Sequence, residues 1–145
     1  MSKNLMIALV LIALALGGYY YTQSNQTAMV PKDTMMEQSS RYQPFTPTVL
    51  ADAASSRRVL YFYANWCPTC IPANADFEKN VSMLPADLTV IRVNYNDPDT
   101  DKEGKALATK YGITYQHTFV QIDADGNELT KWNGGATKEL LAKIK

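Results

Sequence analysis

The stretch VLYFYANWCPTC, residues 59–70, joins a run of apolar and aromatic side chains to two closely spaced cysteines. Residues 59–64 are almost continuously apolar, which is typical of a strand buried in a parallel sheet. We expect a helix to follow over residues 68–81. Pro68 suits its first position, because the fixed φ of proline matches the helix and its missing N–H costs nothing there. The stretch therefore predicts a strand, a turn and a helix, with both cysteines at the turn.

The spacing of Cys67 and Cys70 predicts thiol chemistry at this turn. We expect Cys67 to occupy the N-cap of the helix, where free backbone N–H groups and the positive helix end stabilise a thiolate. Cys70 follows about one helical turn later, close enough to form a disulfide with Cys67. In thiol–disulfide exchange the exposed first thiolate attacks and the more buried Cys70 resolves the mixed disulfide. A pair of structural cysteines, or half of a zinc site, is the alternative interpretation.

Residues 48–145 alternate between helix and strand patterns and predict one α/β domain. The expected strands are 59–64, 88–93, 118–122 and 128–132, and the expected helices are 48–56, 68–81, 101–111 and 137–144. Asp125-Gly126 marks a hairpin between the last two strands, and Thr137 is expected to cap the last helix. Strands separated by helices pair in parallel through right-handed crossovers, and the hairpin adds an antiparallel edge.

The composition excludes several classes of protein. The 145 residues suffice for one ordinary domain, and 14 Lys+Arg balance 14 Asp+Glu, so no basic excess is available to bind nucleic acid. Two cysteines cannot staple a disulfide framework, and with the single His117 they are too few for a closed four-ligand zinc site. We interpret residues 94–101 as a solvated turn, because their spacing lacks the glycine and terminal glutamate of a calcium loop.

The N-terminal residues 1–21 predict a membrane anchor or a signal peptide. Leu5 to Leu16 carries no polar side chain, glycines and tyrosines extend the run to residue 21, and Lys3 is the only charge before it. One interpretation is a single uncleaved span with the tyrosines at the far interface. The other is a cleaved signal that leaves a secreted protein. Both place the domain on the extracytoplasmic side, where disulfides persist. Residues 22–47, polar and proline-containing, are predicted to be a flexible linker.

Five segments of residues 48–145 resemble the thioredoxin superfamily. They are VLYFYANWCPTC, LTVIRVNYND, KYGIT, TFVQIDADGNEL and WNGG. The resemblance implies a central mixed four-stranded sheet flanked by helices. It also implies that Cys67 is the nucleophile, that Cys70 is the resolving cysteine, and that Trp66 shields the site. With its N-terminal segment, the chain resembles bacterial extracytoplasmic thiol–disulfide oxidoreductases, including those that serve cytochrome c maturation.

His117 stands where this superfamily usually has a cis-proline before the third strand. A cis bond before a non-proline residue costs about 3 kcal/mol, so we expect the Gln116–His117 bond to be trans. In the family this loop faces the cysteine pair, which implies that His117 approaches Cys67. As an imidazolium, His117 would lower the pKa of Cys67. Alternatively it completes a metal or iron–sulfur site with Cys67 and Cys70, or it is only a polar loop residue.

Other positions near the motif also matter for function. Tyr61 replaces the buried aspartate that thioredoxins use to take a proton from the resolving thiol. The spacer is Pro68-Thr69, in which the threonine hydroxyl can hydrogen-bond a sulfur. We expect an apolar rim around the thiols on which partner proteins dock, formed by Trp66, Ile71, Ile113 and Tyr115. Residues predicted to tune the thiols or to face them are Trp66, Pro68, Thr69, Gln116 and His117.

The sequence thus predicts a thiol–disulfide oxidoreductase that needs no cofactor beyond its redox-active Cys67–Cys70 disulfide. Its expected partners are protein thiols and disulfides, together with a membrane or extracytoplasmic redox partner. The direction of electron flow stays open, because a neutral Pro-Thr spacer favours neither a strong reductant nor a strong oxidant. The alternative function is a metal or iron–sulfur carrier that uses Cys67, Cys70 and His117.

Overall fold

A computed structural model describes residues 40–145 of the chain. The predicted membrane segment, 1–21, and most of the predicted linker, 22–47, lie outside these residues. Within residues 40–145, no helix combines the length and apolar character that a membrane crossing needs.

A five-stranded mixed sheet forms the centre of the domain, in the order β1-β3-β2-β4-β5. Its strands are β1 (Tyr42–Pro44), β2 (Arg57–Tyr63), β3 (Leu88–Asn94), β4 (Thr118–Ile122) and β5 (Glu128–Asn133). β3 pairs in parallel with both β1 and β2, whereas β4 pairs antiparallel with β2 and β5. The predicted parallel crossover is confirmed for β2 and β3, and so is the antiparallel hairpin of β4 and β5. The expectation of parallel pairing is wrong for β4, which pairs antiparallel with β2 although a helix separates it from β3.

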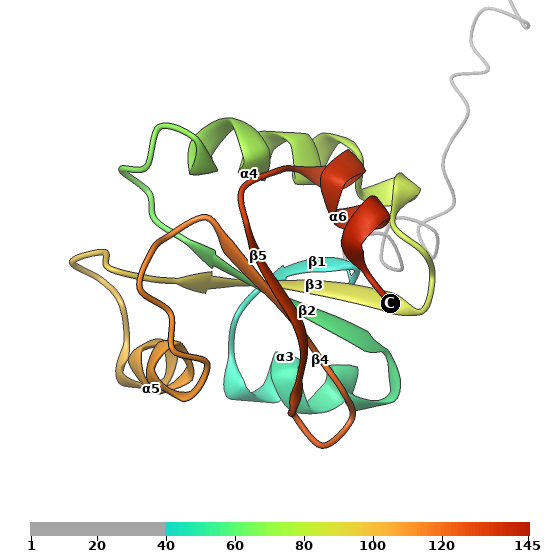
Figure 1. Cartoon of the computed structure of the whole chain (residues 1–145), viewed down its shortest axis with the longest axis horizontal. Helices are drawn as coiled ribbons and strands as arrows, with labels where there is room; N and C mark the ends of the chain where they lie inside the picture. Colours follow the sequence, from blue (N-terminus) through green and yellow to red (C-terminus); the bar gives the residue numbers. More distant parts are fainter. Residues whose placement is uncertain (1–39) are drawn as a thin grey trace, which may run out of the picture. The chain divides into compact units, whose positions relative to one another are not determined.

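Helices cover both faces of the sheet (Figure 1). They are α3 (Pro47–Asp52), α4 (Cys70–Lys79), α5 (Lys102–Lys110) and α6 (Thr137–Lys143), with short 3-10 helices η1 (Ala53–Ser55) and η2 (Val81–Met83). α4 and α6 lie on one face, and α3 and α5 lie on the other. The prediction that Thr137 caps the last helix is wrong: it is the first helical residue, and Ala136 precedes it as the cap.

The predicted number of four strands is wrong, because β1 adds a fifth inside the range assigned to the linker. Its three residues are too few to show any periodicity. Tertiary contacts hold the strand in place. The Tyr42 ring stacks on Phe77 of α4 with 5.3 Å between centroids, and its hydroxyl donates to Asn74 Oδ1 at 2.6 Å. The folded domain therefore begins before residue 48.

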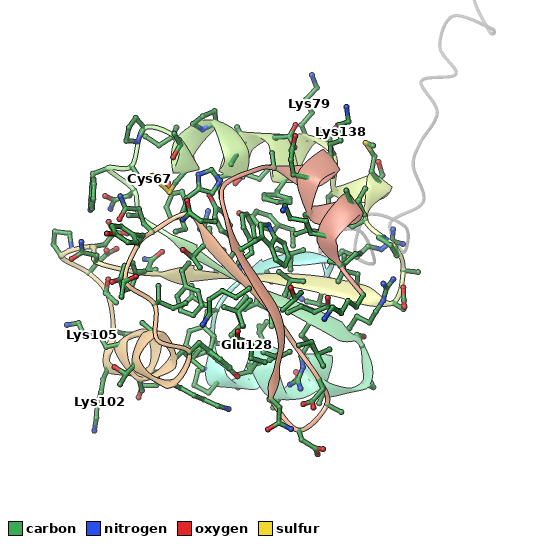
Figure 2. All side chains as sticks on the ribbon, in the orientation of Figure 1. Cys67, Lys79, Lys102, Lys105, Glu128 and Lys138 are labelled. Atoms are coloured by element: carbon green, nitrogen blue, oxygen red, sulfur yellow. A yellow bond between two sulfur atoms is a disulfide. The ribbon has the colours of Figure 1, made fainter. Side chains whose placement is uncertain are left out.

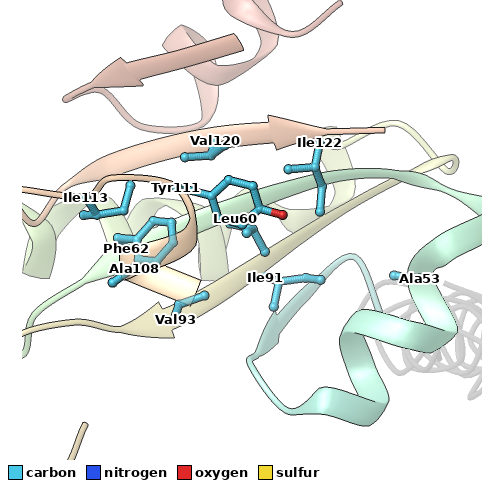
Figure 3. Close-up of a cluster of buried hydrophobic side chains, with 10 residues drawn as sticks. All are labelled: Ala53, Leu60, Phe62, Ile91, Val93, Ala108, Tyr111, Ile113, Val120 and Ile122. Atoms are coloured by element: carbon cyan, nitrogen blue, oxygen red, sulfur yellow. The ribbon is translucent and has the colours of Figure 1, made fainter. Parts of the chain in front are cut away.

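The alternation of β2 side chains builds a core on each face of the sheet. Leu60 and Phe62 point to the α3 and α5 side, where they pack with Ile91, Val93 and Val120 (Figure 3). Val59 and Tyr61 point to the α4 and α6 side. The core there is aromatic: buried Tyr61, Phe77 and Phe119 pack together with partly buried Trp132. Each fully buried apolar side chain contributes about 1.5–3 kcal/mol to the free energy of folding. Because β2 is packed on both faces, the two cores hold the end of β2 and the start of α4 in place.

Candidate active site

Cys67 lies in the loop between β2 and α4 (Figure 2). Cys70 is the first residue of α4. The two cysteines form a disulfide with a Cα–Cα distance of 5.2 Å. Cys67 and Cys70 are 2% and 0% exposed, and they pack with Ala64 and Tyr63 in a small cluster of their own. The predicted Cys67–Cys70 pairing is present in the structure.

The first turn of the helix differs from the prediction. α4 begins at Cys70 with Thr69 as its cap, so both the start and the cap lie two positions after the predicted Pro68 and Cys67. The carbonyl of Cys67 nevertheless accepts the N–H groups of Cys70 and Ile71 at 3.1 and 3.2 Å. The N–H of Cys70 also lies 3.2 Å from Cys67 Sγ. Cys67 therefore makes the hydrogen bonds of an N-cap residue although the regular helix starts later, and an N–H donor faces its sulfur.

The loop between β2 and the disulfide is held by residues that follow β3. The N–H of Asn65 donates to both carboxylate oxygens of Asp97, at 3.0 and 3.1 Å. The indole N–H of Trp66 donates to the carbonyl of Asn96 at 3.0 Å. Asp97 is buried, and this burial raises its pKa. The interpretation of residues 94–101 as a solvated turn is therefore wrong for Asp97, which anchors the cysteine loop.

His117 approaches the disulfide through Thr69. Its peptide bond to Gln116 is trans, as predicted, and its φ is +58°. The hydroxyl oxygen Oγ1 of Thr69 lies 2.9 Å from His117 Nδ1 and 3.4 Å from Cys67 Sγ. The other ring nitrogen, Nε2, lies 2.7 Å from the carbonyl oxygen of Gly135. Because a carbonyl only accepts, Nε2 carries a hydrogen and donates it to Gly135.

The structure brings the three candidate metal ligands together. The sulfurs of Cys67 and Cys70 and a ring nitrogen of His117 lie within 4.8 Å of one another, and all three residues are buried. In this state both sulfurs belong to a disulfide, whereas a metal needs free thiolates. The geometry shown is therefore that of a redox pair, and metal binding would require its reduced form.

Tyr61 lies below the site but is not placed to act as a base. Its hydroxyl donates to the backbone carbonyl of Cys70 at 3.2 Å. Burial, reinforced by the nearby Tyr63, raises the pKa of Tyr61, so it keeps its proton at neutral pH. The aspartate that Tyr61 replaces in the family therefore has no equivalent at this position.

The predicted apolar rim is only partly exposed. Trp66 and Ile71 are each 50% exposed, and Tyr115 is 71% exposed. Ile113, by contrast, is 8% exposed and packs in the core with Ala108 and Tyr111, so its assignment to the rim is wrong. The position of Ile113 in the loop before β4 did not show which way its side chain points.

A shallow groove of about 500 Å³ runs beside the disulfide, between α4 and the segment that leads into α6. Thr69, His117 and Gly135 contribute to its wall, with Asp76 and Glu139 further along. Sequence analysis missed Gly135 as a contact of His117. Its φ of +101° explains why a glycine occupies this position. The two glycines of the WNGG segment are the signal in the sequence that could have indicated a turn here.

The remaining predicted loop residue, Gln116, fastens this loop to the outer strand. Its carbonyl accepts a hydrogen bond from Asn133 Nδ2 at 3.1 Å, and the same amide donates to the carbonyl of His117. The N–H of Gly134 also donates to the His117 carbonyl at 2.8 Å. β5 therefore positions the loop that carries His117.

Comparison with known families assigns this domain. A family model described as a thioredoxin-like domain matches residues 45–145. The chain belongs to the thioredoxin-like family. The matched range covers the whole sheet except β1, together with all four helices from α3 onward. The predicted thioredoxin-like α/β fold is thereby confirmed.

Solved structures of thioredoxins share the fold of this thioredoxin-like domain. Trxlp from Edwardsiella tarda is 23% identical, with a TM-score of 0.53, over 70% of this chain and 94% of that chain. The long form of thioredoxin f from spinach chloroplast is 18% identical, with a TM-score of 0.55, over 77% and 89%. Schistosoma mansoni thioredoxin is 20% identical, with a TM-score of 0.54, over 70% and 93%. No curated protein sequence matches the chain.

These sequence identities support the fold alone, and evidence for the reaction comes from the cysteine site. A thioredoxin-like domain with a disulfide-bonded cysteine pair at the start of α4 supports a thiol–disulfide redox enzyme in general.

Proposed function

We propose that this protein is a membrane-tethered, extracytoplasmic thiol–disulfide oxidoreductase that acts on other proteins through Cys67 and Cys70. The observation that carries the proposal is the Cys67–Cys70 disulfide at the start of α4. There the N–H of Cys70 faces Cys67 Sγ at 3.2 Å. An N–H donor and the positive end of a helix stabilise a thiolate on Cys67 when the disulfide is reduced.

The reaction is a pair of thiol–disulfide exchanges. The Cys67 thiolate attacks one sulfur of a substrate disulfide, forming a mixed disulfide and releasing the other substrate sulfur as a thiolate. Cys70, fully buried and one turn away, then attacks Cys67 Sγ and releases the second substrate thiol. Two electrons pass to the substrate, and the Cys67–Cys70 disulfide forms again. In the opposite direction the same steps oxidise a substrate dithiol.

The surface around the disulfide supports protein substrates. Trp66, Ile71 and Tyr115 leave large apolar areas in solvent, and the neighbouring groove is shallow. Enclosed pockets suit small molecules, whereas a partly apolar surface with a shallow groove suits a polypeptide that must present a disulfide. The redox partner that returns Cys67 and Cys70 to their starting oxidation state is proposed to be a membrane or extracytoplasmic thiol protein.

The proposed location depends on the sequence of the N-terminal segment. Leu5 to Leu16 is uncharged and apolar, and Lys3 precedes it. A single span with Lys3 on the cytoplasmic side would hold the domain outside the cytoplasm. Labelling intact cells with a membrane-impermeant maleimide after mild reduction tests this placement, with Cys67→Ala/Cys70→Ala as the unlabelled control. Labelling only after cell lysis would contradict it.

The first experiment measures the reduction potential of the full-length protein by equilibration with glutathione. The chain has only two cysteines, so the measured couple belongs to Cys67 and Cys70. A value near about −270 mV indicates a reductant and a value near about −120 mV an oxidant. A metal assay of the same reduced sample tests the alternative function. Stoichiometric metal that blocks the titration and is lost in His117→Ala would replace the oxidoreductase proposal with the carrier.

A second experiment identifies substrates as proteins. In Cys70→Ala the mixed disulfide cannot be resolved, so we expect Cys67 to retain protein partners in bonds that dithiothreitol releases. The matched variant Cys67→Ala keeps Cys70 and should retain none. Equal capture by the two variants would contradict the assignment of Cys67 as nucleophile.

A further inference from the structure

A chain of hydrogen-bonding groups leads from Cys67 to the protein surface. Cys67 Sγ lies 3.4 Å from Thr69 Oγ1, which lies 2.9 Å from His117 Nδ1. His117 Nε2 ends the chain on the carbonyl of Gly135 at 2.7 Å. Thr69 is exposed, and Thr69, His117 and Gly135 all border the groove of about 500 Å³. The chain therefore connects a buried sulfur to solvent.

The acceptor at its far end fixes the direction of every hydrogen bond. Because the Gly135 carbonyl only accepts, Nε2 of a neutral His117 holds the ring proton and Nδ1 is left as an acceptor. The Thr69 hydroxyl then donates to Nδ1 with its single hydrogen, and its lone pairs face Cys67 Sγ. In the reduced protein the Cys67 thiol has a hydrogen that it can donate to Thr69 Oγ1.

We propose that Thr69 relays a proton between the Cys67 thiol and His117, which generates the attacking thiolate. The S–H bond of Cys67 breaks and its proton joins Thr69 Oγ1, while the original hydroxyl proton moves to His117 Nδ1. The result is a Cys67 thiolate, an unchanged threonine and an imidazolium. No electron moves in this step. The thiolate then accepts a hydrogen bond from Thr69, whose oxygen accepts one from Nδ1.

The inference rests on the proposed function, since it supplies the nucleophile for that exchange. His117 acts here as a positioning and proton-holding residue, because it reaches the reacting sulfur only through Thr69. When a substrate sulfur leaves as a thiolate, the proton passes from His117 through Thr69 to that thiolate, because Cys67 is then held in the mixed disulfide. Tyr61, which lacks the role of the family's aspartate, is not needed for this step.

Other titratable groups around His117 keep one charge state across neutral pH. From β2, the Tyr61 ring lies 5.7 Å from the His117 ring, and burial raises the pKa of Tyr61. From α4, hydrogen bonds from Thr137 and Asn80 lower the pKa of Asp76. From α6, the N–H of Ala136 lowers the pKa of Glu139. A pH-dependent change of Cys67 reactivity near neutrality therefore arises from Cys67 itself and from His117, and variants of Thr69 and His117 isolate the relay.

The test is the rate at which iodoacetamide alkylates Cys67 as a function of pH. Full-length protein carrying Cys70→Ala is used, with chelator present, so that one thiol is measured and metal is excluded. We expect Thr69→Val to raise the pH midpoint by about one unit, a tenfold loss of thiolate at a fixed lower pH. Thr69→Ser keeps the hydroxyl and should keep the midpoint. Thr109→Val, an exposed threonine on α5, is the matched control.

A double substitution separates a relay from two independent effects. His117→Asn should raise the midpoint as Thr69→Val does, and the double variant should show no further rise, because both break one chain. An unchanged midpoint in Thr69→Val, or shifts that add in the double variant, would overturn the relay. If His117→Asn fails to fold, the comparison of Thr69→Val with Thr69→Ser decides.

Alkylation needs no protein substrate, so the two proposals fail separately. A protein that shows the predicted midpoints but exchanges no disulfide with any protein would overturn the proposed function. A protein that exchanges disulfides, but whose Thr69→Val variant keeps the parent midpoint, would overturn the relay alone.

Discussion

The backbone N–H of His117 donates to the carbonyl oxygen of Phe62 at 2.7 Å, where the loop before β4 meets β2. His117 also adopts a φ of +58°. Proline can satisfy neither condition, because it has no N–H and its φ is fixed near −65°. The backbone conformation of this loop therefore requires a residue other than proline at position 117, and histidine also supplies a ring that can exchange protons.

Restoring proline at this position should destabilise the domain. We expect His117→Pro to lower the free energy of unfolding by about 3 kcal/mol, the cost of a lost hydrogen bond and an incompatible φ. His117→Asn should cost less, because asparagine tolerates the left-handed region better than most residues. Urea unfolding of both variants measures the difference. Equal stability of the two would show that the loop rearranges freely.

Asp97 should stabilise the loop that carries the cysteines. Asp97→Ala leaves the N–H of Asn65 without its acceptor, for which we expect a loss of about 1–3 kcal/mol in unfolding experiments. Asp97→Asn keeps an acceptor oxygen and should cost less. Burial raises the pKa of Asp97 above its usual 3.8, so the wild type also loses stability as this group ionises with rising pH. That part of the pH dependence should be absent in Asp97→Asn.

Gly135 should be far less replaceable than Gly112. A Cβ at Gly135 would lie 2.6 Å from the Cβ of Glu139, and its φ is +101°. At Gly112 the φ is +58° and nothing lies within 4 Å of an added Cβ. We expect Gly112→Ala to cost about 1–2 kcal/mol and Gly135→Ala clearly more. Only Gly135→Ala should also shift the Cys67 alkylation midpoint, because it displaces the carbonyl that holds His117.

The β4–β5 hairpin should lose stability in acid through Asp123. The side chain and backbone N–H of Asn127 donate to the Asp123 carboxylate at 3.0 and 2.8 Å. These bonds lower the pKa of Asp123 below its usual 3.8. Its contribution is therefore complete above pH 3.8 and disappears as the pH falls through the lower folded value.

Thermal unfolding across pH 7 to pH 2 measures this contribution. The melting temperature of Asp123→Asn should lie below that of the wild type at neutral pH, and the gap should close in acid. A gap that stays constant down to pH 2 would show that the hydrogen bonds, rather than the charge they stabilise, account for the effect.

Most of the fold is predictable because its elements carry their own local patterns. The apolar run at 59–64 and the Asp125-Gly126 turn each lie within one element and are visible without tertiary information. β1 shows the limit. Tyr42–Pro44 becomes a strand because Tyr42 reaches Phe77 and Asn74, residues more than 30 positions later. A short stretch of sequence around Tyr42 does not include these contacting residues, so local patterns cannot predict the strand.

The site divides in the same way. The cysteine spacing predicts the disulfide, and the resemblance to the thioredoxin superfamily implies that the loop with His117 lies near it. The hydrogen bond between Thr69 and His117 joins residues 48 positions apart, and it depends on the left-handed φ of His117. The burial of Asp97 and Ile113 likewise depends on how the loops after β3 and α5 fold back onto the sheet, which composition does not reveal.

β1 also protects the sheet against edge-to-edge aggregation with other copies of the domain. It occupies one side of β3 and makes a short outer strand that ends in Pro44, which has no N–H to offer another chain. At the opposite border, β5 carries Glu128 and Lys131, joined by an ion pair at 2.8 Å. The short border that ends in proline and the opposite border that carries charges both discourage the addition of foreign strands. We expect partners to meet the domain end-on, at the loops around the thiols, and not by extending its sheet.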